Sequence, residues 1–325
     1  MTTAAATSLS STSADQFAAE VRDGLCRAGQ KTLPSKYLYD ALGSTLFDAI
    51  SLLPEYGLTR AEERILRRHA ADIVRHVPGP ALVSELGSGN GRKTRWILTA
   101  LCQREPLSYY PIEISRTALE SCESELSDIE SVSIVGVERE YLDGLSEVAA
   151  LRPAGTHLLV LFLGSTIGNF DAGADVRFLR SVHGFLLPGD SLLLGADLMK
   201  PRDRMLLAYD DPLGITAAFN LNLLARINRE LDGDFDLRQF EHLALFNDAA
   251  DSIEMHIRSK RRQVVNIGRD TWSAAFGDGE TIWTESCHKY TRAAIAGLAA
   301  ESGFRLDGQW IDDEWPFAES LFVVV

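Results

Sequence analysis

Cysteine is scarce in this chain of 325 residues, and the four that occur lie far apart, at Cys26, Cys102, Cys122 and Cys287. They form no CxxC pair, and no histidine lies at metal-ligand spacing, so we expect neither a metal site nor a disulfide framework. Dispersed thiols are typical of a reducing compartment. The sequence therefore predicts a cytoplasmic protein.

Long apolar runs and positive charge are also lacking. No run reaches the length of a membrane span, and the N-terminal residues lack the basic and apolar regions of a secretion signal, so we expect no membrane association. The formal net charge of −14 disfavours nucleic acid as a partner, because binding to phosphates relies on clustered lysine and arginine. A small neutral or cationic molecule is a better match for this charge.

The composition, with 46% hydrophobic and 24% charged residues, is typical of a globular protein. The length exceeds that of one usual hydrophobic core, which favours two domains. Residues 1–14, rich in Ala, Ser and Thr, are predicted to be a disordered tail. We expect a nucleotide-binding core over 61–199 and 286–325, and a second, smaller α+β domain over 15–60 and 200–285 that binds substrate.

The predicted core alternates strands with helices. Apolar strands are expected at 81–85, 109–114, 158–163 and 191–198, and helices at 92–102, 116–126 and 175–186. This order predicts an α/β fold with a sheet that is mainly parallel and covered by helices. The regularity is lost after residue 200, where a helix at 215–231 precedes strands at 252–257 and 263–267. A helix at 292–302 and strands at 305–311 and 321–325 close the chain.

A glycine-rich turn follows the first of these strands. Gly87, Gly89 and Gly91 have the spacing GxGxG, whereas the dinucleotide fingerprint is GxGxxG, which disfavours a nicotinamide-dependent oxidoreductase. With Glu85 two residues before the first glycine, the segment resembles the turn of class I methyltransferases. The resemblance implies that Glu85 lies near the amino acid end of S-adenosylmethionine (SAM). The expected cofactor site includes Gly87, Ser88, Gly89 and Lys93.

Three later segments complete this predicted site. Glu113 lies 22 residues beyond Gly91 (113 − 91), close to the spacing at which an acidic side chain accepts hydrogen bonds from a ribose. Glu140 and Tyr141 are candidate contacts to the adenine, although a Glu-Tyr dipeptide alone is equally typical of ordinary surface. The loop 164–169 follows the most apolar strand, where ligands bind in open α/β sheets, and there Asn169 would face the transferred methyl group.

Stretches across most of the chain resemble the histidine-specific methyltransferases of ergothioneine biosynthesis. They cover residues 36–44, 53–60, 162–169, 208–211, 216–220 and 253–255. That family makes hercynine by three successive methylations of the α-amine of L-histidine. The resemblance implies a Rossmann-like class I methyltransferase with SAM as cofactor, no metal, and a free amino acid as substrate; we expect a monomer.

The resemblance also implies individual roles. Tyr56, Asn169 and Tyr209 would hold the amine and carboxylate of the amino acid, with Tyr56 and Asn169 orienting the reacting amine. Tyr39, Met255 and Glu285 would surround the side chain. Without the resemblance, Tyr39 and Tyr56 read as buried aromatics and Met255 as a core residue.

One residue departs from the family pattern. Cys287 stands where the family has a serine that contacts the imidazole, and a thiol is a poorer hydrogen-bond partner than a hydroxyl. Two further hypotheses therefore stay open. One is an N-methyltransferase of another free amino acid, such as tryptophan or tyrosine, and the other is a non-catalytic protein that keeps the fold.

Overall fold

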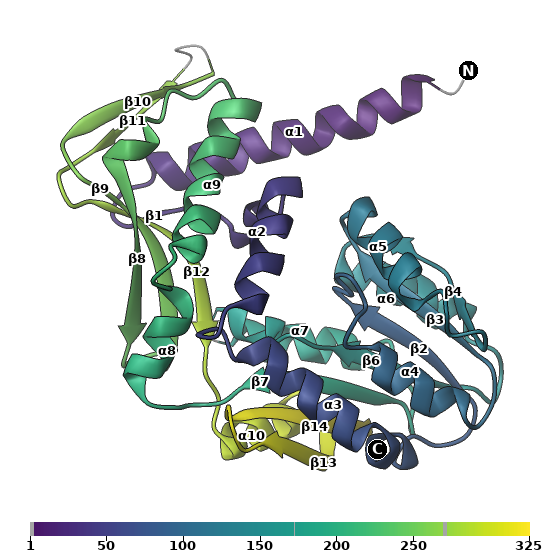
Figure 1. Cartoon of the computed structure of the whole chain (residues 1–325). Coiled ribbons are helices and arrows are strands. Elements are labelled where there is room, and N and C mark those ends of the chain that lie inside the picture. The colour runs from purple at the N-terminus through teal and green to yellow at the C-terminus, as the bar shows by residue number, and fades with distance from the viewer. Residues whose placement is uncertain (1–2, 172, 269–271) are drawn as a thin grey trace. The chain divides into compact units, whose positions relative to one another are not determined.

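The computed structural model describes residues 3–171, 173–268 and 272–325, and the chain forms two compact units (Figure 1). The core unit comprises Gly57–Lys200 and His288–Val325, and the insertion unit comprises Met1–Tyr56 and Pro201–Cys287. The sequence placed the corresponding boundaries at residues 61, 200 and 286. Each unit is described by itself below.

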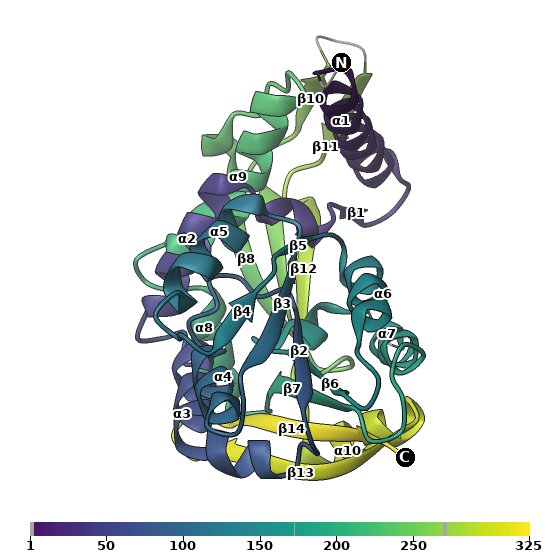
Figure 2. The ribbon, with the colours of Figure 1, turned by 90° about the vertical axis from the view of Figure 1, so that its right-hand side faces the viewer.

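The core unit contains one sheet in the order β13-β14-β7-β6-β2-β3-β4, with β5 also paired to β3 (Figure 2). Strands β7, β6, β2, β3 and β4 pair in parallel, while β14 is antiparallel to both β7 and β13. The strands are β2 (Ala81–Leu86), β3 (Leu107–Glu113), β4 (Val132–Ile134), β5 (Val137–Glu138), β6 (His157–Phe162), β7 (Ser191–Asp197), β13 (Phe304–Asp312) and β14 (Phe317–Val324). This arrangement confirms the predicted Rossmann-like α/β fold.

Helices cover this sheet because its central strands are apolar on both faces. Every residue of β7 is buried, as is every residue of β6 after His157. Helices α6, α7 and α10 contribute side chains to the same hydrophobic core as β6 and β7. The helices are α3 (Leu58–Arg75), α4 (Arg95–Cys102), α5 (Arg116–Leu126), α6 (Tyr141–Leu151), α7 (Ala174–His183) and α10 (Arg292–Glu301), with a short 3-10 turn η2 (Thr166–Asn169).

The insertion unit is built on a sheet in the order β1-β12-β9-β8. Strand β1 (Lys31–Thr32) pairs in parallel with β12 (Thr281–His288), and β8 (Phe240–Asn247) pairs antiparallel with β9 (Ser252–Ser259). A separate ribbon joins β10 (Gln263–Ile267) to β11 (Trp272–Phe276). The helices are α1 (Thr3–Cys26), α2 (Ala41–Leu52), α8 (Arg202–Tyr209) and α9 (Ile215–Glu230), with 3-10 turns η1 (Ser35–Leu38) and η3 (Leu237–Gln239). Figure 1 shows α9 running beside β8 and β9.

The N-terminal segment differs from the prediction. Residues 1–14 were expected to be a disordered tail, but α1 begins at Thr3 and continues to Cys26. The helix contains no proline, its single glycine is Gly24 near the end, and alanine is its commonest residue, which together favour helix. Over the described residues, no helix combines the length and apolarity needed to cross a membrane.

Candidate active site

The turn after β2 adopts a backbone that glycine permits. Gly87, Gly89 and Gly91 have φ angles of +75°, +52° and +70°. A Cβ atom at Gly91 would lie 2.6 Å from the Sγ of Cys122, so this glycine packs the turn against α5. At Gly89 a Cβ atom would meet nothing within 4 Å. The backbone of Gly89 is therefore open to a ligand, as the predicted cofactor turn requires.

Glu85 supports the turn from inside the protein. Its side chain is 2% exposed, and its Oε2 accepts hydrogen bonds from Thr94 Oγ1 at 2.7 Å and from the hydroxyl of Tyr109. Burial raises the pKa of Glu85 to about 7, although these two hydrogen bonds oppose the shift. Thr94 precedes α4 without making a side-chain capping hydrogen bond, and α4 begins at Arg95 instead of the predicted residue 92.

The structure brings Tyr141 and Glu113 to the first glycine of the turn. The hydroxyl of Tyr141 lies 3.0 Å from the position of a Cβ atom on Gly87, and burial together with the nearby charge of Glu113 raises the Tyr141 pKa. Glu113 ends β3, and its Oε1 accepts from the backbone N–H of Ile114 at 2.9 Å. Glu140, the exposed residue before α6, adjoins Tyr141 in the chain.

Ser88 gives a direct test of whether the turn fits a cofactor. Its side-chain oxygen is buried, and the thiol of Cys122 beside it is a weak hydrogen-bond partner. Buried hydroxyls are normally well satisfied, so this hydroxyl beside an open glycine keeps hydrogen-bonding capacity that a polar ligand would use. These residues fit the polar end of SAM.

Lys93 is linked to the loop of Asn169 through a residue that the sequence did not indicate. The Nζ of Lys93 forms an ion pair with Glu62 on α3, and the Oε1 of the same Glu62 accepts a hydrogen bond from the backbone N–H of Gly164. Burial alone would lower the Lys93 pKa, but the charge of Glu62 raises it. One carboxylate thus contacts both predicted cofactor and acceptor segments.

The loop 164–169 is held in a conformation that costs backbone energy. Ser165 has a φ angle of +59°, which is unfavourable for a residue other than glycine. Its Oγ accepts a hydrogen bond from the backbone N–H of Asp197 at 2.9 Å, and the hydroxyl of Tyr290 donates to the carbonyl of Ile167 at 3.2 Å. These contacts fix the short turn η2, which ends at Asn169.

The insertion unit gathers the aromatic residues expected on the substrate side. The ring of Tyr56 lies 6.0 Å from that of Tyr209 and 6.2 Å from that of Phe47, and the ring of Phe47 lies 5.5 Å from that of Tyr39. Phe219 of α9 joins them, 5.5 Å from Tyr39. We call these five residues the aromatic cluster. Their T-shaped and tilted contacts are favourable ring geometries.

Residues of β12 and β9 provide the polar part of this side. Glu285 and Cys287 are two residues apart on β12, so their side chains project to the same face of the sheet, and both are buried. The hydroxyl of Tyr209 donates to the Sγ of Cys287 at 2.8 Å. Met255 is buried in β9, the neighbour of β12 in the sheet.

A buried network fixes the backbone around Tyr209. Asn220 of α9 donates to the Nδ1 of His242 at 2.9 Å, and the Nε2 of His242 donates to the carbonyl of Tyr209 at 2.8 Å. Asn220 also accepts from the Oγ1 of Thr284, next to Glu285, at 2.7 Å. Burial lowers the pKa of His242, which favours the neutral ring that this arrangement needs.

Comparison with known proteins agrees with this geometry. Residues 17–324 match the family described as histidine-specific methyltransferases, SAM-dependent. The chain belongs to this family. The methyltransferase and SAM predictions are thereby confirmed, and the nicotinamide-dependent oxidoreductase is excluded.

Relatives of this methyltransferase include enzymes with two different named substrates. The chain is 41% identical over 315 residues to the histidine N-alpha-methyltransferase of Mycolicibacterium smegmatis, covering 95% of each chain, and 41% identical over 293 residues to that of Mycobacterium tuberculosis, covering 90% of each. It is 28% identical over 326 residues to the L-tryptophan methyltransferase of Psilocybe serbica, covering 91% of this chain and 89% of the relative.

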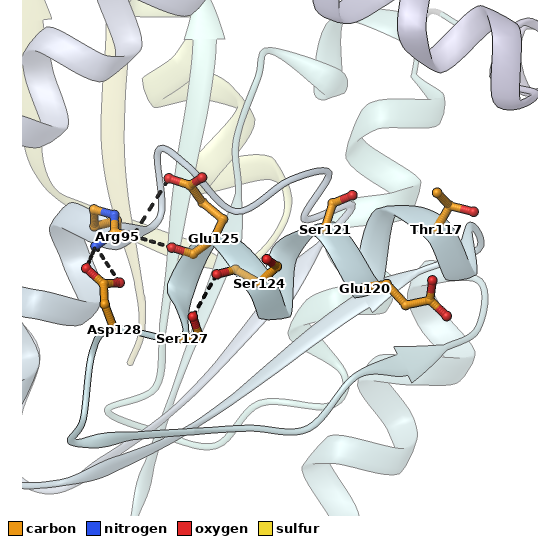
Figure 3. Close-up of a pocket in the computed structure, with 8 residues that line it drawn as sticks. All are labelled: Arg95, Thr117, Glu120, Ser121, Ser124, Glu125, Ser127 and Asp128. Carbon is orange, nitrogen blue, oxygen red and sulfur yellow. Dashed lines mark hydrogen bonds and ion pairs between the residues drawn. The ribbon is translucent and has the colours of Figure 1, made fainter.

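The methyltransferase core has a surface cavity lined by residues other than those of the predicted site. It has a volume of about 640 Å³ and is lined by Arg95 and polar residues of α5 and the turn after it (Figure 3). Arg95 pairs there with Asp128 at 2.9 Å. Of the described residues that line it, none belongs to the predicted site. Within the same described residues, no group of three or more His, Cys, Asp or Glu could hold a metal ion.

Several residues of the methyltransferase site escaped the sequence analysis, although some left a signal. Glu62 occupies a position on the buried face of α3, between Ala61 and Ile65, where an apolar residue is expected. Glu319 likewise interrupts the apolar strand β14. A charged residue at a core position indicates a specific partner. Tyr109 and Asn220 carried no such signal, because neither side chain is charged.

Proposed function

We propose that this chain transfers methyl groups from SAM to the α-amine of L-histidine, three times, to give hercynine for ergothioneine biosynthesis. The observation that carries the proposal is the aromatic cluster, together with the hydrogen bond from Tyr209 to Cys287. These contacts bring together Tyr39, Tyr56, Tyr209 and Cys287, each of which the family resemblance assigned to the substrate. The names of the two mycobacterial relatives support histidine as the acceptor. Action in the cytoplasm as a monomer on a free amino acid remains part of the proposal.

The insertion unit is proposed to bind the amino acid. Tyr56 and Tyr209 would hold its polar end, and the family resemblance implies the same role for Asn169. Tyr39, Met255 and Glu285 would surround the imidazole, with Glu285 accepting a hydrogen bond from a ring N–H. Because Cys287 already accepts from Tyr209, it would act on the substrate through that tyrosine as well as through its own thiol.

The core unit is proposed to bind SAM. The open backbone at Gly89 and the buried hydroxyl of Ser88 would contact the methionine portion. Glu85, Gly87 and Lys93 would lie next to this part of SAM. Glu113 would accept hydrogen bonds from the ribose, as carboxylates do in nucleotide-binding sheets. Glu140 and Tyr141 would contact the adenine.

The cofactor supplies the electrophilic methyl group, so the protein must align the amine and exclude water. A free α-amine is largely protonated near neutral pH, and only its neutral form has the lone pair that attacks. Tyr56 and Asn169 would orient that lone pair by hydrogen bonding, and one proton leaves to solvent for each methyl group gained. Aromatic faces of Tyr39, Phe47 and Tyr56 would stabilise the methylated cation.

Tryptophan is the second candidate substrate, since Cys287 replaces the family serine and a relative is named for tryptophan. The deciding experiment is mass spectrometry of products from histidine, tryptophan and tyrosine, each incubated with SAM and the full chain. Histidine carrying three added methyl groups is the expected product. Modified tryptophan or tyrosine with unmodified histidine would overturn the histidine assignment, and no methylation of any amine would favour a non-catalytic role.

A further inference from the structure

Two glutamates outside the proposed contacts to SAM and substrate lie in the core unit under the loop of Asn169. Glu62 of α3 is fully buried, with its Oε1 accepting from the N–H of Gly164 and its Oε2 paired with Lys93. The Nζ of Lys93 lies 3.6 Å from the position of a Cβ atom on Gly164. Glu62 therefore holds together the start of this loop and the lysine that follows the glycine turn.

Glu319 lies beside Glu62 because a glycine leaves room for both. In the antiparallel pairing of β14 with β7, Glu319 is directly opposite Gly195. A Cβ atom on Gly195 would lie 2.5 Å from the Oε1 of Glu62 and 3.1 Å from the Oε1 of Glu319. The two carboxyl groups thus share the space that any larger residue at position 195 would fill.

The surroundings of Glu319 indicate that its carboxyl group is protonated. Its side chain is fully buried, and as a carboxylate it would find no hydrogen-bond donor for either oxygen among the described residues. Burial of an ionised carboxylate without hydrogen-bond donors costs several kcal/mol, so the protonated, neutral form of Glu319 is favoured. Burial and the neighbouring charge of Glu62 raise the pKa of Glu319 well above its ordinary value.

We propose that Glu62 and Glu319 form a proton-sharing carboxyl pair that positions Lys93 and the loop of Asn169 for methyl transfer. Glu319 carries the proton and donates it in a hydrogen bond to Glu62. This bond leaves Glu62 ionised to hold Lys93 and the N–H of Gly164. Both are positioning residues. The proposal rests on the proposed function only in assigning Asn169 to the acceptor amine.

The test compares Glu319→Gln, which keeps a hydrogen-bond donor of similar size, with Glu319→Met, which removes it. The infrared spectrum of wild type minus that of Glu319→Gln, recorded on the full chain at neutral pH, should show a protonated carboxyl band, because the contribution of the partly protonated Glu85 is common to both proteins and cancels. Glu319→Met should lower kcat by about 10-fold or more, the usual effect of losing a hydrogen bond to a charged group, with a smaller change in KM for the amino acid. Glu319→Gln should recover most of that loss.

Controls separate this proposal from the choice of substrate. Glu301→Gln, at an exposed carboxyl group on α10, should leave the band and kcat unchanged. The band and the calorimetric affinity for S-adenosylhomocysteine need no acceptor, and kcat is measured with whichever amino acid wild type methylates. If the band is missing from the difference between wild type and Glu319→Gln, or if Glu319→Met turns over like wild type, the pair does not have this role. If Glu319→Met fails to fold, the band and the Glu319→Gln kinetics still decide.

Discussion

Glu85 makes the stability of the core unit depend on pH. Its pKa of about 7 in the folded chain compares with an ordinary 4.5. Between these values the folded state binds a proton that the unfolded state has lost, so stability is fully present below about pH 4.5 and falls as the pH rises through about 7. The rise in pKa from 4.5 to about 7 corresponds to about 3 kcal/mol in the free energy of unfolding.

Glu85→Gln removes this titration while keeping an oxygen that accepts from Thr94 and Tyr109. We expect urea unfolding to show that wild type loses about 2.5 kcal/mol relative to Glu85→Gln between about pH 5 and pH 8. Because the comparison is between two proteins at each pH, other titrating groups cancel. The exposed Glu301→Gln serves as the control and should follow wild type. A difference between wild type and Glu85→Gln that stays constant over this pH range would refute the assigned protonation of Glu85.

Four further outcomes follow from named contacts. Glu113→Ala should weaken SAM binding by about 1.5 to 3 kcal/mol in calorimetry while the fold survives, and unchanged affinity would contradict the ribose contact. Asn169→Ala should lower the methylation rate more than SAM affinity, whereas equal losses would indicate collapse of the loop. Gly195→Ala should lower the melting temperature and kcat, because its Cβ would displace the Glu62 carboxylate 2.5 Å away; an unaffected variant would argue against the close approach. Glu285→Leu should lower kcat/KM for histidine far more than for tryptophan, and an unchanged ratio would show that Glu285 does not read the side chain.

The repeating part of the fold could be predicted because its signals are local. The apolar runs of β6 and β7 and the glycines after β2 each identify an element without reference to the rest of the chain. The prediction fell short at β14, expected only from residue 321, because Glu319 and Ser320 break its apolar run. The burial of Glu319 depends on Gly195 of β7, far away in sequence.

The candidate site likewise combines features that the sequence predicted with one that it did not. The glycine turn and Glu113 follow from spacing along the chain, but the pairing of Glu62 with Lys93 joins α3 to the turn after β2. No local pattern records that pairing, since it exists only once the sheet has formed. The sequence contained only a charged residue at a core position of an amphipathic helix. Such a residue indicates that a partner exists without identifying it.

Substrate choice in the proposed site depends on how the polar groups near Tyr209 are satisfied. The Sγ of Cys287 accepts from the hydroxyl of Tyr209, so this thiol has a partner inside the protein. A hydrogen bond from the substrate to a carboxylate is stronger than one to a neutral thiol. Glu285, a buried carboxyl group on the same face of β12, is proposed to accept a hydrogen bond from the imidazole, which an apolar side chain could not donate. Selectivity for histidine is therefore expected to depend more on Glu285 than on residue 287, which explains how a histidine-specific site can tolerate cysteine in place of serine.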